Sequence, residues 1–171
     1  MRDVKLVNSK GFHMKITANS QNFTVDNVTI TAPGDSPNTD GIHISKSTKV
    51  NITNSVIGTG DDCVSIGDGN TDVFVSKITC GPGHGISIGS LGKRETETDL
   101  KNIIITNCTL TNTTNGARIK SYRESPKLLA TGITFEDIIM NGVQNPIIID
   151  QNYNSANKAG VSTLNTDQCI F

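Results

Sequence analysis

A repeated two-strand pattern is the feature of this sequence that most limits its fold. The order apolar, x, apolar, x, x, apolar, x, apolar occurs five times, starting at residues 23, 50, 73, 103 and 133. Each occurrence is followed by a second short alternation: "GIHIS", "CVSIG", "GISIG", "GARIK" and "PIIID". A period of two indicates β-strands, and spacings of 27, 23, 30 and 30 residues fit the coils of a solenoid. We predict an all-β, right-handed parallel β-helix of about five coils.

The same alternation predicts the interior of the helix. In the second strands the inward pairs are expected to be Ile42 and Ile44, Val64 and Ile66, Ile86 and Ile88, Ala117 and Ile119, and Ile147 and Ile149. In the first strands Ser55 is the one polar inward residue. A tight bend is expected in the middle of each first strand, because Asn and Asp tolerate left-handed backbone. The residues at this position are Asn27, Asn54, Lys77, Asn107 and Asp137. An antiparallel sandwich explains the constant order of the two strands less well.

Domain organisation follows from where the repeat stops. We expect residues 1–153 to form the coils of one domain, with at most a partial coil in residues 1–22. Residues 154–171 are expected to be a polar C-terminal tail, a truncated continuation of the helix. The repeat has no terminal caps, so further coils are expected on both sides in a longer protein.

Composition excludes several classes of function. The net charge is −1, Lys and Arg are scattered and Trp is absent, which argues against a nucleic-acid-binding surface. No apolar run is long enough to cross a bilayer, and the N-terminus lacks the pattern of an export signal. The four cysteines lack the paired spacing of a zinc site. We expect a monomer with a Cys63–Cys80 disulfide and a buried Cys108 thiol, while Cys169 has no evident partner.

Stacking the second strands brings ionisable side chains into one column. The residue two positions before each first inward residue is Asp40, Asp62, His84, Asn115 or Asn145. Because coils of a β-helix lie about 4.8 Å apart, the first three are expected on successive rungs. Asp61 precedes Asp62 at a bend, so its carboxylate can point elsewhere. Neighbouring carboxylates repel, so the pKa of at least one should be raised, as a general acid beside a general base requires.

Two cations are expected on the same face. Arg118 and Lys120 occupy outward positions of the fourth second strand. A guanidinium binds a carboxylate at two points, so this pair beside a column of acids suits a substrate that carries carboxylates. Any one of these charged residues alone could be an ordinary surface residue. The prediction of a site rests on their lying in register on one face.

Four motifs in order resemble the polygalacturonases. They are "NTD" at residues 38–40, "GDD" at 60–62, "GHG" at 83–85 and "RIK" at 118–120. Members of this family are inverting glycoside hydrolases that cut the galacturonan of pectin and fold as right-handed β-helices. The resemblance covers nearly all of residues 20–153. It is closest to the plant enzymes, and "RIKSY" resembles the pollen exo-acting group.

The resemblance implies a catalytic role for four residues. Asp61 would be the general acid that protonates the glycosidic oxygen, and Asp40 and Asp62 would hold and activate the attacking water. His84 would keep Asp61 correctly protonated. An inverting enzyme needs space for a water between acid and base, about 6.5 to 9.5 Å between the carboxyl groups.

The resemblance also implies how the substrate binds. Arg118 and Lys120 would bind galacturonate carboxylates, Tyr153 would close the subsite, and Asn38 would be a further substrate-binding residue. No metal or organic cofactor is implied, and the expected partner is polygalacturonate in the plant cell wall, which makes the protein secreted. Asn154 stands where the family has a cysteine, the usual partner of Cys169.

Two other functions stay open. One is an inactive truncated β-helix that binds galacturonan or acts as an allergen. The other is a calcium-dependent pectate lyase, in which acids would chelate the metal and an arginine would be the base. The presence of all four motifs argues against the lyase.

Overall fold

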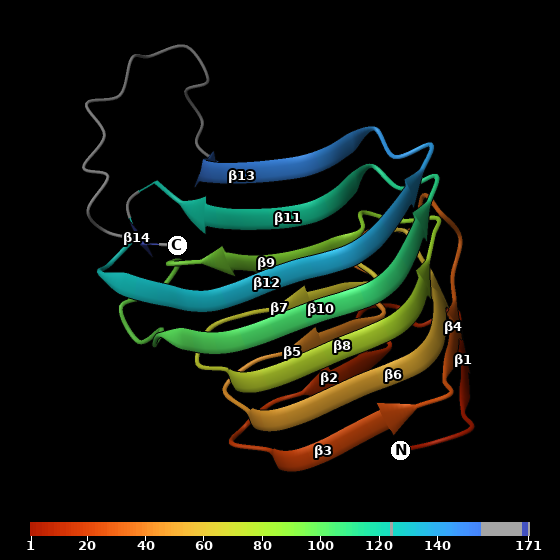
Figure 1. Cartoon of the computed structure of the whole chain (residues 1–171), viewed down its shortest axis with the longest axis horizontal. Helices are drawn as coiled ribbons and strands as arrows, with labels where there is room; N and C mark the ends of the chain where they lie inside the picture. Colours follow the sequence, from red (N-terminus) through yellow and green to blue (C-terminus); the bar gives the residue numbers. More distant parts are fainter. Residues whose placement is uncertain (124, 155–168, 171) are drawn as a thin grey trace.

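The structure is a computed structural model that describes residues 1–123 and 125–154, with the backbone of 169–170. Strands of the described residues form two parallel sheets that face one another, and the chain passes from one sheet to the other in each coil, which confirms the predicted β-helix of about five coils (Figure 1). The larger sheet has the order β1 (Lys5–Val7), β4 (Thr29–Thr31), β6 (Thr48–Gly58), β8 (Thr71–Cys80), β10 (Leu100–Thr111), β12 (Leu128–Asn141) and β14 (Cys169–Ile170), with β3 (Gln21–Asp26) also paired to β6. The smaller has the order β13 (Asn145–Tyr153), β11 (Asn115–Tyr122), β9 (Ile86–Leu91), β7 (Val64–Ile66), β5 (Ile42–Ile44) and β2 (Met14–Ile16).

Stacked aliphatic side chains from both sheets fill the interior. Ile44, Ile66 and Ile88 are register partners on β5, β7 and β9, and all three are fully buried. Ser55 is buried among apolar residues, where its hydroxyl accepts a hydrogen bond from the Val28 amide and donates one to the Thr53 carbonyl. This inward hydroxyl both donates and accepts a hydrogen bond, so its burial costs little free energy.

The predicted bends in the first strands are confirmed. The φ angle is positive, between 51° and 56°, at Asn27, Asn54, Lys77, Asn107 and Asp137. Four of the five residues are Asn or Asp, which tolerate left-handed backbone. The bend lets each long strand turn a corner while its inward residues keep facing the core.

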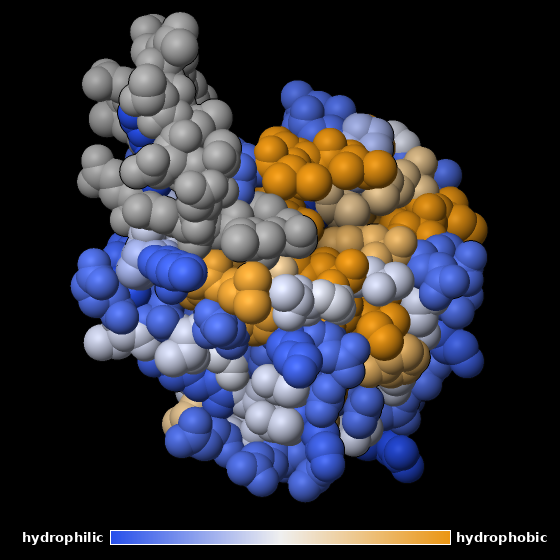
Figure 2. Space-filling view, turned by 60° about the vertical axis from the view of Figure 1, so that its left-hand side comes forward, coloured by the Kyte–Doolittle hydropathy of each residue, from blue (hydrophilic) through white to orange (hydrophobic). Residues whose placement is uncertain are grey.

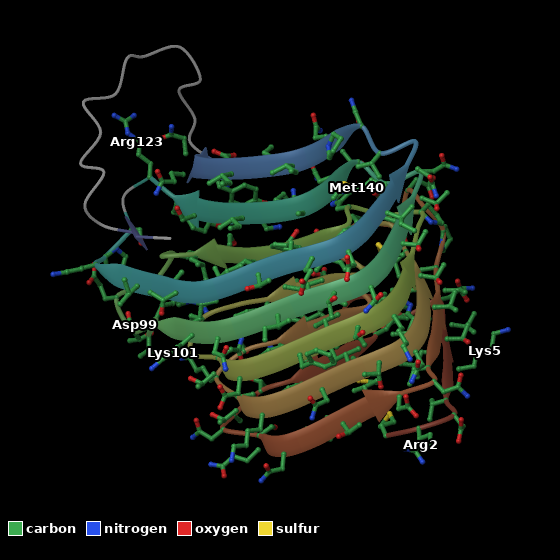
Figure 3. The ribbon with its side chains drawn as sticks, in the orientation of Figure 1. Arg2, Lys5, Asp99, Lys101, Arg123 and Met140 are labelled. Atoms are coloured by element: carbon green, nitrogen blue, oxygen red, sulfur yellow. A yellow bond between two sulfur atoms is a disulfide. The ribbon has the colours of Figure 1, made fainter. Side chains whose placement is uncertain are left out.

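The predicted inward pair of the last coil takes its expected register but is not buried. Ile147 pairs with Ala117 and Ile149 with Ile119. Yet Ile147 is 75% and Ile149 62% exposed, because β13 is the edge strand of its sheet and no described strand covers it. Figure 2 shows hydrophobic surface gathered at this end of the solenoid, and Figure 3 marks Met140 there, near the end of β12.

The N-terminal residues contribute more than their pattern suggested. The expected partial coil in residues 1–22 supplies β1 to the larger sheet and β2 to the smaller one. Met14 and Ile16 of β2 pair with Ile42 and Ile44 of β5. The smaller sheet therefore has one additional strand, β2, next to β5, the strand that follows Asp40.

The structure describes the side chains of three of the four cysteines. Cys63 and Cys80, the expected pair, form a disulfide, and Cys108 is a buried free thiol. The side chain of Cys169 and residues 155–168 of the predicted tail lie outside the described residues. In the described part of the chain, no helix has the length and apolar character needed to span a membrane.

Candidate active site

The smaller sheet places the acid column. Asp40, Asp62 and His84 each lie two residues before a strand, respectively β5, β7 and β9. Backbone hydrogen bonds join these segments rung to rung: the Gly41 amide donates to the Asp62 carbonyl over 2.9 Å, and the Cys63 amide to the Gly85 carbonyl over 2.8 Å. The three residues therefore lie on successive rungs of one face.

Asp62 is at the centre of a hydrogen-bond network. Its side chain is almost fully buried. Its Oδ1 accepts hydrogen bonds from Arg118 Nη2 at 2.6 Å and Ser87 Oγ at 2.8 Å, and its Oδ2 accepts one from Lys120 Nζ at 3.0 Å. Arg118 Nε also donates to Ser87 Oγ at 2.9 Å. The two cations that the sequence places on this face thus converge on one carboxylate and hold it in a single orientation.

Asp61 points away from that network and pairs with His84. Its Oδ1 lies 3.0 Å from His84 Nδ1 and accepts a hydrogen bond from the Asp62 amide at 2.8 Å. Burial alone would raise the pKa of Asp61, but the hydrogen bonds from His84 and from the Asp62 amide lower it below its ordinary value. The same bond to Asp61 raises the pKa of His84, although burial opposes this. A proton shared by the pair therefore resides on the imidazole.

The two glycines of the "GHG" motif allow His84 to approach Asp61. Gly83 has a φ of +147°, and a Cβ there would lie 2.6 Å from the Asp61 carbonyl oxygen. Gly85 has a φ of +87°, and its Cβ would collide with the Asn115 carbonyl oxygen. Only glycine fits both positions without strain. A side chain at either position would strain the backbone next to His84.

Asp40 is the carboxyl group that retains a proton most readily. It is 7% exposed, and its pKa is raised to about 6, first by burial and then by the negative charge of Asp61. A hydrogen bond with Ser65 opposes the shift. Ser65 Oγ is also 2.8 Å from Nδ1 of His43. The site therefore has the raised carboxyl pKa expected of neighbouring acids, and Asp40 carries it.

A groove of about 400 Å³ runs along this face. Its lining includes six of the residues singled out from the sequence: Asn38, Asp40, Asp61, Asp62, Lys120 and Tyr153. The Tyr153 ring lies 5.2 Å from Lys120 Nζ and packs edge-on against Tyr122. His84 and Arg118 are outside the lining and hold lining carboxylates in place. All eight are thus brought into one region.

A metal ion fits this region poorly. Asp61, Asp62 and His84 offer ligand atoms within 4.8 Å of one another. However, both Asp62 oxygens already accept hydrogen bonds from cations, and His84 Nδ1 is bonded to Asp61. A divalent ion here would be repelled by Arg118 and Lys120. The donor set is better explained as a hydrogen-bond network.

Comparison with known proteins identifies the family. The profile of glycosyl hydrolases family 28 matches residues 1–168. The chain belongs to glycosyl hydrolases family 28. It is 51% identical to a polygalacturonase of Medicago sativa over its whole length and 50% identical to an exopolygalacturonase of Platanus acerifolia over 90% of its length. It covers 41% and 40% of those two proteins.

Solved structures agree with this family 28 assignment. Endopolygalacturonase I of Stereum purpureum, in complex with two galacturonates, has a TM-score of 0.80 at 27% identity, over 90% of this chain and 46% of that one. Endo-xylogalacturonan hydrolase of Aspergillus tubingensis has a TM-score of 0.83 at 28% identity, over 91% and 44% of the two chains. The family 28 chain thus spans less than half of the proteins that it matches.

The structure adds residues that the motifs did not single out. Ser65 contacts Asp40, and Ser87 links Asp62 to Arg118. Both serines are outward residues of the strands that follow the column, so their register was the available signal. Phe12 and Lys15 also line the groove, from a rung that the repeat pattern does not contain.

Proposed function

We propose that the protein to which this chain belongs hydrolyses the α-1,4-galacturonosyl linkages of polygalacturonate by single displacement, with inversion at the anomeric carbon. One observation carries the proposal: three carboxyl groups on one groove have three different environments. Asp61 is paired with an imidazole, Asp62 is bound by two cations, and Asp40 is buried with a pKa of about 6. Separate acid and base roles need such differences. The relatives named polygalacturonase support the choice of substrate.

In this proposal the acid step belongs to the Asp61–His84 pair. The pair binds one proton, which resides on the imidazole before substrate arrives. A galacturonate carboxylate near Asp61 would raise the pKa of Asp61 through charge repulsion and draw the proton onto it. As the bond from the anomeric carbon to the glycosidic oxygen breaks, the oxygen keeps the electron pair and takes the proton from Asp61.

The base step belongs to Asp40 and Asp62. In their ionised forms they hold a water on the opposite side of the sugar, and the water oxygen bonds to the anomeric carbon while Asp40 accepts its proton. Asp62 serves mainly to orient the water, since its oxygens are already bound by Arg118, Lys120 and Ser87. The proton on Asp40 then returns to solvent, and the Asp61–His84 pair takes up another.

Substrate binding in this proposal uses the end of the groove near Lys120 and Tyr153. Lys120 and Arg118 supply positive charge for a galacturonate carboxylate, and the Tyr153 ring packs beside Lys120. Asn38 is exposed on the lining and can donate hydrogen bonds to a sugar hydroxyl. We further propose that the protein acts outside the cell, in the plant cell wall where this substrate occurs, and that it is a monomer.

The test is release of reducing ends from polygalacturonate by the wild-type protein and by Asp61→Asn, with circular dichroism as the control for folding. We expect release by the wild type and a loss of at least about 100-fold in the variant, the usual contribution of a general acid. Binding without release would favour the non-catalytic alternative. An ultraviolet-absorbing unsaturated product that disappears with a chelator would favour the lyase.

A further inference from the structure

The groove face continues one rung before Asp40. Met14 of β2 pairs with Ile42 of β5, and the His13 amide donates to the Asp40 carbonyl over 2.9 Å. Asp40 lies two residues before Ile42, and Phe12 lies two residues before Met14. Phe12 therefore takes the position in the acid column that precedes Asp40. It is 41% exposed and lines the groove.

Lys15 lies near Phe12, in the row of outward-facing residues that crosses the smaller sheet. Lys15 pairs with His43, His43 with Ser65, Ser65 with Ser87, and Ser87 with Arg118. Lys15 and Arg118 are thus four rungs apart, about 19 Å at 4.8 Å per rung. The catalytic carboxylates lie between them. Lys15 and Arg118 thus lie on opposite sides of these carboxylates along the sheet.

Each end of the groove has a cation beside an aromatic ring. Lys120 Nζ lies 5.2 Å from the centre of the Tyr153 ring, and Lys15 Nζ lies 5.7 Å from the centre of the Phe12 ring. The His43 ring stacks on the Phe12 ring, with the ring centres 4.8 Å apart and an angle of 12° between the ring planes. The second end thus repeats the chemistry of the first.

Lys15 differs in its partners from Lys120 and Lys46, two of the other cations that line the groove. Lys120 is bound to Asp62, and Lys46 lies 4.0 Å from Asp68. Lys15 forms no salt bridge within the described ranges 1–123 and 125–154. Its ammonium group can therefore take an external carboxylate without giving up an internal one.

We propose that Phe12 and Lys15 form a second uronate-binding subsite, on the opposite side of the catalytic acids from Lys120 and Tyr153. The inference rests on the proposed function, since it assumes a chain of uronates in the groove. The ammonium group of Lys15 pairs with the carboxylate of one sugar, and the Phe12 ring packs against the apolar face of that sugar. One rung from Asp40, the subsite holds a sugar close to the bond that is cleaved.

The experiment measures binding of hexagalacturonate by calorimetry, in the Asp61→Asn background to prevent hydrolysis. Lys15→Gln removes the charge and Phe12→Leu removes the ring, and both positions are exposed, so the fold is retained. Lys101→Gln is the matched control, because it makes the same charge change at an exposed site on β10 in the other sheet (Figure 3). Circular dichroism verifies that all variants share the parent spectrum.

We expect Lys15→Gln to weaken hexagalacturonate binding about fivefold, the most that a solvent-exposed ion pair usually contributes, while Lys101→Gln has no effect. Phe12→Leu should weaken binding by a similar factor of about five, because it removes the ring that packs against the sugar. The Lys15 effect should shrink at high salt, because screening weakens exposed pairs. If the parent binds and both groove variants match Lys101→Gln, the subsite is wrong and the proposed function stands. If the parent does not bind hexagalacturonate, the proposed function fails and the subsite with it.

Discussion

His84 Nδ1 lies 3.0 Å from Asp61 Oδ1, and this contact decides where the acidic proton of the site resides. It raises the pKa of His84 and lowers that of Asp61, against the effect of burial on both groups. Without the hydrogen bonds that it accepts, burial would raise the pKa of Asp61. In the proposed mechanism, the imidazole holds the proton until a negatively charged substrate draws it onto the carboxylate. Asp61 and His84 are therefore expected to act as one unit.

Replacing His84 tests this unit. We expect His84→Gln to lower kcat about 100-fold and to move the basic limb of the pH profile of kcat to lower pH. In the wild type that limb follows the imidazole, whose pKa is raised above 6.5, whereas in the variant it follows the Asp61 carboxyl group. The measurement is kcat against pH for both proteins. An unchanged basic limb would show that His84 does not hold the catalytic proton.

Asp40→Asn should stabilise the fold at neutral pH. Because its pKa rises from 3.8 to about 6 on folding, Asp40 contributes stability that is fully present below pH 3.8 and is lost as the pH rises through about 6. The asparagine side chain is neutral, so the variant avoids the free-energy cost of burying a charged carboxylate. We expect a gain on the order of 2 to 3 kcal/mol in the free energy of unfolding near pH 7. Urea unfolding below pH 3.8 is the control, and an equal gain there would contradict this explanation.

Asp62→Asn should have the opposite effect. It leaves Arg118 and Lys120 without their carboxylate, and their side chains are only 12% and 8% exposed. We expect a loss of about 3 kcal/mol in the free energy of unfolding near pH 7, the lower end for a broken buried pair. Asp62→Asn combined with Lys120→Met should recover part of this loss in the same urea experiment. Equal losses in the single and double variants would mean that the pairing with Lys120 contributes little.

The register of the coils made part of this site predictable. Side chains alternate every two residues and coils stack without slippage, so positions in the repeat were enough to align Asp40, Asp62 and His84. The contacts of Arg118 were not predictable, because its side chain leaves β11, bonds Ser87 on β9 and reaches Asp62 before β7. Such contacts depend on the conformations of long side chains, which alternation does not encode.

Two other features of the structure could not be predicted from the repeat pattern, for different reasons. Phe12 belongs to a coil whose first strand, β1, has only three residues, so the long first-strand alternation of the later coils is missing. Ile147 and Ile149 follow the template, yet they are exposed at the edge of the sheet. A period of two predicts the direction of a side chain, whereas burial also needs a neighbouring strand to cover it.

If Asp40 and Asp62 hold a water opposite the leaving oxygen, cleavage is a single displacement, and the stereochemistry of the product reveals it. The measurement is time-resolved proton NMR of a defined galacturonate oligomer during cleavage. We predict that the new reducing end of this α-linked substrate appears first as the β-anomer, before it equilibrates, because the water attacks from the face opposite the leaving oxygen. First appearance of the α-anomer would mean retention through a covalent intermediate and would contradict the account.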